Sequence, residues 1–118
     1  MRWSSMFLLS ALVVALLPTA SGKADAVPKT AFRLSIVNQM FEPNTLTIPA
    51  GQTVKVMVKN KDSLPAEFEG RDFHVEVVIP GKAELPVYIR SLNSGTYHFF
   101  NDFHPESKGT LIVKKAAQ

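Results

Sequence analysis

Carboxylates separated by a single residue are the feature of this sequence best suited to chemistry. Glu67 and Glu69 flank Phe68, and in an extended segment side chains two residues apart project from the same face. Two negative charges about 7 Å apart repel each other unless a cation or a basic group relieves them. Asp102 and His104 repeat this spacing around another phenylalanine. Both pairs are therefore candidate metal ligands.

Other side chains capable of ligation are carboxylates and imidazoles from the same two regions, together with one thioether; they are Asp72, His74, Glu76, Glu106 and Met40. The sequence has no cysteine, which excludes thiolate-dependent zinc and iron–sulfur sites. Oxygen-rich sets with one or two imidazoles suit iron or Cu(II). The alternative is that these carboxylates only face water, as acidic residues on strands and loops usually do. His74 is open to two interpretations, as a ligand or as the partner of Asp72.

Several other classes of function find no support in the residues. There is no thiol nucleophile and no serine in a Gly-x-Ser-x-Gly elbow, so nucleophilic catalysis is disfavoured. Glycine-rich phosphate loops are absent as well. A net charge of +3, without runs of basic residues interleaved with aromatics, does not indicate nucleic-acid binding.

The elements that must position the candidate ligands are predicted to be strands. Apolar and polar residues alternate over 32–36, 54–58 and 85–89, and Tyr97 and Phe99 share one face of a later segment, as do Leu111 and Val113. Proline and glycine interrupt these segments about every ten residues, and no window has helical periodicity. This pattern predicts an all-β sandwich or barrel, with Asp102 and His104 in the loop between the last two strands.

The N-terminal segment reads as a signal peptide. Arg2 precedes an apolar run over 6–17, which is short for a membrane span, and small residues follow it. We expect a signal peptide over 1–26 with cleavage after Gly22 or Ala26, and one domain over 27–118. The mature protein is then expected in the periplasm and does not span the membrane. A membrane anchor is the alternative.

The framework of the domain resembles the cupredoxins, which implies a Greek-key β-sandwich. The resemblance rests on three patterns: Phe41-x-Pro43-x-x-Leu46-x-Ile48-x-x-Gly51-x-x-Val54 followed by Asn60, Gly95-x-Tyr97-x-Phe99, and Gly109-x-Leu111-x-Val113. It implies that the cysteine, histidine and methionine positions of a blue-copper site hold Asn101, His104 and Lys108. The region of Glu67 and Glu69 replaces the other histidine. Blue-copper chemistry needs the thiolate, so ordinary cupredoxin electron transfer is not expected.

A narrower group looks more similar still: the small periplasmic cupredoxin-like proteins of bacterial ferrous-iron transport systems, which resemble the cupredoxin domain of elemental-ferrous-iron uptake proteins. The shared segments are Ala66-Glu67-Phe68-Glu69, Val78-Ile79-Pro80-Gly81 and Gly95 to His104. This resemblance implies binding of Fe(II), its oxidation with help from copper, and delivery of Fe(III) to an inner-membrane iron permease. The expected partners are that permease and other periplasmic components of the uptake system.

On that resemblance we expect Glu67 and Glu69 to bind iron. Met40 and His104 are expected to contribute to a copper site, with Asp102 bridging or orienting. His74 and Glu76 have no assigned role. Two other functions remain open, namely a periplasmic copper carrier without turnover and a metal-free module that docks through its acidic loops.

Overall fold

A computed structural model describes residues 13–15 and 32–116. The predicted signal peptide over 1–26 lies outside the described residues except for 13–15, which have no regular structure, and so do residues 27–31 of the predicted domain. Strands make up most of the described domain: β1 Phe32–Val37, β2 Met40–Glu42, β3 Thr45–Pro49, β4 Val54–Asn60, β5 Ala66–Gly70, β6 Val75–Ile79, β7 Glu84–Ile89, β8 Gly95–Asn101 and β9 His104–Lys114. A 3-10 turn, η1 (Arg71–Phe73), connects β5 to β6. Within the described part, no helix is long and apolar enough to cross a membrane.

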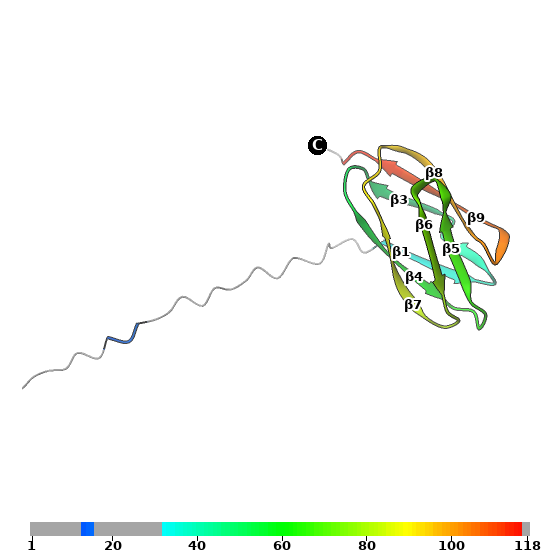
Figure 1. Ribbon diagram of the computed structural model, residues 1–118, viewed down its shortest axis with the longest axis horizontal. Coiled ribbons are helices and arrows are strands. Elements are labelled where there is room, and N and C mark those ends of the chain that lie inside the picture. Colours follow the sequence, from blue (N-terminus) through cyan, green and yellow to red (C-terminus); the bar gives the residue numbers. More distant parts are fainter. Residues whose placement is uncertain (1–12, 16–31, 117–118) are drawn as a thin grey trace, which may run out of the picture.

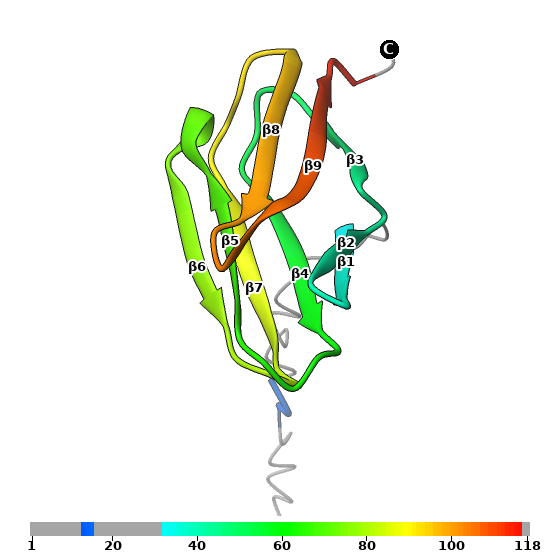
Figure 2. The same cartoon turned by 90° about the vertical axis from the view of Figure 1, so that its right-hand side faces the viewer.

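The strands form two mixed sheets that pack as a sandwich (Figures 1 and 2). One sheet has the order β2-β1-β4-β7 and the other β3-β9-β8-β5-β6. The pairs β1–β4 and β3–β9 are parallel, and the remaining pairs are antiparallel. The prediction of an all-β sandwich is therefore confirmed.

Period-two alternation places the apolar side chains between the sheets. Val54, Val56 and Val58 are all buried along β4, while the alternate residues Lys55 and Lys59 are exposed. Phe68 and Phe99, from neighbouring strands of the other sheet, stack with ring centroids 5.0 Å apart. Phe41 meets the ring of Phe99 edge-on at 4.9 Å. Each such buried side chain contributes about 1.5–3 kcal/mol, so the rings join the two sheets at the end of the sandwich where β5 begins.

Two polar residues hold the loops at this end. Asn60 is fully buried and donates hydrogen bonds to the carbonyls of Leu64 and Ile79 at 2.8 and 3.1 Å. Its side-chain oxygen accepts a hydrogen bond from the backbone N–H of Asp62 at 3.0 Å. The carboxylate of Asp62 accepts hydrogen bonds from the backbone N–H groups of the β1–β2 turn at 2.8 and 2.7 Å. These bonds satisfy backbone groups that no strand pairs, which keeps the loops before β5 in one arrangement.

Candidate metal centre

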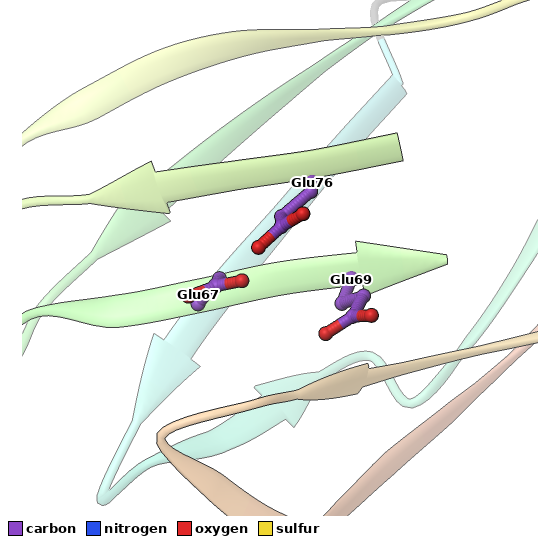
Figure 3. Close-up of side chains that lie close together, drawn as sticks. All are labelled: Glu67, Glu69 and Glu76. Atoms are coloured by element: carbon purple, nitrogen blue, oxygen red, sulfur yellow. The ribbon is translucent and has the colours of Figure 1, made fainter. Parts of the chain in front are cut away.

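Three carboxylates meet on the outer face of the five-stranded sheet. Phe68 points into the core, so Glu67 and Glu69 on either side of it point outward. The antiparallel register of β5 and β6 pairs Glu69 directly with Glu76. Each of the three glutamates offers an oxygen within 4.8 Å of the other two (Figure 3). Carboxylates this close are a ligand set for a hard cation.

Glu67 is the unusual member of this carboxylate cluster, because only 5% of its surface is exposed. A hydrogen bond shared with the side chain of Glu76, burial, and the negative charges of Glu76, Asp102 and Glu69 raise the pKa of Glu67 to about 7. Its Oε1 atom is buried and has no hydrogen-bond partner. A buried carboxylate oxygen without a partner is costly, and a cation held among the three glutamates would relieve that cost.

Asn101 fixes the backbone that carries Glu67. Its side-chain oxygen accepts hydrogen bonds from the N–H groups of Glu67 and Phe103 at 3.0 and 3.1 Å. Its amide nitrogen donates to the carbonyl of Gln39 at 3.3 Å. The N–H of Asp102 also donates to the carbonyl of Glu67 at 3.0 Å. The β1–β2 turn, β5 and the β8–β9 turn are therefore tied together beside the cluster.

Arg71 places a positive charge next to the cluster. It begins the 3-10 turn that follows β5, and its Nε lies 3.2 Å from Oε1 of Glu69. Its guanidinium carbon also lies 4.9 Å from the centre of the Phe100 ring, a cation–π distance. A hollow beside this pair is lined by Glu69, Gly70, Arg71, His74, Val75 and Glu76. Two members of the cluster, Glu69 and Glu76, therefore border this hollow.

The buried side chain of Phe73 anchors the turn that carries Arg71. Phe73 is fully buried, and a Cβ atom on Gly70 would come within 2.0 Å of its ring. Only glycine leaves this space free, so Gly70 allows Phe73 to fold back under β5. His74 then takes a left-handed conformation with φ of 57°, and its N–H bonds to the carbonyl of Arg71 at 3.3 Å. The side chain of His74 is exposed at the edge of the hollow.

The other predicted ligands lie outside the carboxylate cluster. Asp102 is exposed in the β8–β9 turn and acts on Glu67 through its charge. His104 was predicted in the loop, but it is the first residue of β9. Its Nε2 lies 3.9 Å from a carboxylate oxygen of Glu106, and it lines a separate hollow with Lys61, Asp62 and Lys82. Met40 is 44% exposed on β2, an edge strand of the opposite sheet. The structure thus joins Glu67 and Glu69 but adds a third carboxylate that the sequence left without a role.

The position of Glu76 opposite Glu69 could have been predicted from the spacing of two short extended segments in the sequence. Segments 66–70 and 75–79 are short and extended, with four residues between them. If they form a hairpin, Gly70 pairs with Val75, and Glu69 must then face Glu76. Treating the two segments as a hairpin would have identified the third ligand.

The residues at the blue-copper positions do not fit a blue-copper centre. All polar atoms of the Asn101 side chain are engaged in hydrogen bonds, and the chain supplies no thiolate. Lys108 faces solvent, whereas Ser107 beside it is fully buried, so Lys108 does not point inward as a ligand would. The carboxylate cluster, in contrast, fits a hard cation in donor type and proximity.

A small sandwich of two mixed sheets is the architecture of cupredoxin-like proteins. The family model for the Cupredoxin-like domain matches residues 8–113, and the chain belongs to this family. A curated relative, the uncharacterized protein RP394 of Rickettsia prowazekii (strain Madrid E), is 28% identical over 82 residues, which are 69% of this chain and 66% of that protein.

Solved structures of similar fold include two cupredoxins. A purple cupredoxin from Nitrosopumilus maritimus matches with a TM-score of 0.57 and 20% identity, covering 70% of this chain and 99% of its own. Amicyanin from Paracoccus versutus matches with a TM-score of 0.59 and 21% identity, covering 75% of this chain and 86% of its own. At this level of identity the likeness concerns the fold.

Proposed function

We propose that this protein binds iron at Glu67, Glu69 and Glu76 as the periplasmic component of a ferrous-iron uptake system. The observation that carries the proposal is the partnerless, buried Oε1 of Glu67 inside a group of three carboxylates. An acidic cluster alone is often only solvated, but Glu67 is a buried residue with a partnerless carboxylate oxygen, and such a group is costly unless a cation or a proton compensates it. The predicted signal peptide supports the location, and the resemblance to iron-transport proteins supports iron as the cargo.

The donor set favours oxidation of bound iron. Carboxylates are hard anionic ligands and stabilise Fe(III) more than Fe(II), so the iron potential falls when iron is held by three of them. One electron leaves each Fe(II) and must reach an acceptor. Copper(II) is the acceptor that the resemblance implies, and an amicyanin variant in the Cu(I) form is among the chains of similar fold.

For copper, the remaining donors are an imidazole and a thioether on the accessible surface, which suit copper in both oxidation states. The His104 side chain is 39% exposed, and Met40 is 44% exposed. We assign these two residues to hold copper, which when bound supplies the one-electron acceptor. Asp102, which is expected to bridge or orient, lies in the turn between Asn101 at the end of β8 and His104 at the start of β9. Fe(III) then passes from the glutamates to an inner-membrane iron permease.

The iron site is tested by titration calorimetry of the metal-free protein. Fe(II) under anaerobic conditions, Fe(III) supplied as the nitrilotriacetate complex, and Cu(II) are titrated into the wild type and into Glu67→Gln, Glu69→Gln and Glu76→Gln. Glu84→Gln is the matched control, because Glu84 lies on β7 of the opposite sheet and pairs with Arg33. Loss of iron binding in the three variants but not in the control supports the site, and unchanged iron affinity in all of them refutes it.

Turnover is tested by following Fe(II) oxidation in air with and without stoichiometric Cu(II). Acceleration that needs both the protein and copper supports a copper-assisted ferroxidase. Binding of Cu(II) without binding of iron and without acceleration would favour the copper carrier. Binding of neither metal would favour the metal-free docking module.

A further inference from the structure

We propose that Arg71 is an exchangeable counter-ion of the carboxylate cluster, which a bound cation displaces from Glu69 and which weakens the binding of trivalent cations more than that of divalent ones. This inference rests on the proposed cation site. Arg71 then contributes to the selectivity of the site between cations and to the release of the bound cation.

Arg71 and a metal ion would compete for the same carboxylate. The Nε of Arg71 lies 3.2 Å from Oε1 of Glu69, and Glu69 offers one of the oxygens that lie within 4.8 Å of one another in the cluster. When the Glu69 carboxylate binds a cation held among the glutamates, its interaction with the Arg71 guanidinium becomes weaker. The ion pair is therefore a contact of the metal-free state.

The pair is weak enough to be exchanged. The Arg71 side chain is 72% exposed, against 16% for Glu69, and solvent-exposed ion pairs contribute only about 0–1 kcal/mol. Arg71 has a second contact that does not involve Glu69, because its guanidinium carbon lies 4.9 Å from the centre of the Phe100 ring. The guanidinium can thus leave the carboxylate and still rest on the aromatic ring.

The position of Arg71 is held by the fold. Phe73, two residues on, is fully buried and packs against Gly70, so the 3-10 turn cannot carry Arg71 far from the cluster. Arg71 also lines the hollow that borders Glu69 and Glu76. A cation that reaches Glu69 and Glu76 therefore has a positive charge close by, even when the guanidinium has left Glu69.

Repulsion by that charge scales with the charge of the bound ion. Coulomb energy is proportional to the product of the charges. Arg71 therefore repels a trivalent ion one and a half times as strongly as a divalent ion at the same place. Three carboxylates alone would favour the trivalent ion and hold it tightly. Arg71 reduces this preference, which suits a site that must release Fe(III) to a partner.

The test compares Mn(II) and Ga(III), the latter supplied as its nitrilotriacetate complex, binding to the full protein by calorimetry and competition. Arg71→Gln removes the charge, and Arg71→Lys keeps the charge without the planar stacking group. Arg33→Gln is the matched control, because Arg33 forms the same type of exposed Arg–Glu pair, 3.5 Å from Glu84 on the opposite sheet. Circular dichroism and the thermal midpoint verify that each variant is folded.

We expect Arg71→Gln to tighten Ga(III) binding roughly fivefold and Mn(II) binding roughly threefold. Arg71→Lys is expected to keep the wild-type ratio of the two affinities, and Arg33→Gln to change neither affinity. If the wild type binds the ions but Arg71→Gln binds no more tightly than Arg33→Gln, this inference is wrong and the proposed site stands. Equal tightening for both ions, or weaker binding, would also overturn it. If the wild type binds neither ion, the proposed site itself is refuted.

Discussion

The side-chain oxygen of Asn101 accepts a hydrogen bond from the backbone N–H of Glu67 at 3.0 Å, across 34 residues of sequence. The same oxygen accepts from Phe103, and the amide nitrogen donates to Gln39. Asn101 stands where the cupredoxin resemblance places a copper-binding cysteine. In this protein the residue at that position has a structural task, which is to hold the strand that carries the buried carboxylate.

Replacing Asn101 by alanine should therefore destabilise the whole end of the sandwich. Asn101→Ala leaves the buried N–H of Glu67 and the part-buried carbonyl of Gln39 without their partner, and we expect a loss of about 2–4 kcal/mol in the free energy of unfolding. Chemical denaturation measures this loss. Asn93→Ala is the control, since Asn93 is exposed and only its backbone carbonyl accepts a hydrogen bond, from Tyr97. A loss for Asn101→Ala no larger than that of the control would contradict the assigned role.

The raised pKa of Glu67 makes stability depend on pH in a defined window. Between its unperturbed value of 4.5 and about 7, the folded protein keeps a proton that the unfolded chain has released, so stability falls as the pH rises through this range. We expect a decrease on the order of 1–3 kcal/mol that is complete above about pH 8.

Glu67→Gln removes the titrating group, and its amide can still donate to Glu76. This variant should lose that part of the pH dependence, so that its stability relative to the wild type increases from pH 5 to pH 8 and then stays constant. Denaturation curves at several pH values measure the difference, with Glu84→Gln as a control that should follow the wild type. A constant difference across the window would show that Glu67 does not titrate there.

The same proton should oppose metal binding. Below about pH 7 a cation must displace the proton from Glu67, so affinity for Mn(II) should rise with pH by up to about tenfold per unit between pH 5 and 7 and then level off. Calorimetry in buffers of different ionisation enthalpy would detect the released proton. Affinity that is flat over this range would mean that Glu67 does not bind the ion.

Gly70 should be intolerant of any side chain. A Cβ atom there would lie 2.0 Å from the ring of Phe73, which is fully buried. We expect Gly70→Ala to cost about 2–3 kcal/mol of stability, because overpacking forces the ring or the turn to move. Gly95→Ala is the control, because the nearest atom, on Tyr97, would be 3.7 Å away. Equal stability of the two variants would show that the turn after β5 adapts freely.

Much of the fold could be predicted from local pattern. The alternation of Val54, Val56 and Val58 identifies a strand and its buried face, because side chains alternate across any strand regardless of what packs on it. The same rule placed Glu67 and Glu69 on one face before any partner strand was known, and the absence of cysteine excluded thiolate chemistry.

The structure alone decided how these pieces meet. The register of β5 with β6 brought Glu76 opposite Glu69, and contacts between distant segments buried Glu67 while leaving Asp102 exposed. Periodicity is a property of one segment and specifies the direction of a side chain. Burial, the pKa and the distance between ligands depend on which other segments lie beside it, and those contacts form only when distant segments pair in the folded sheet.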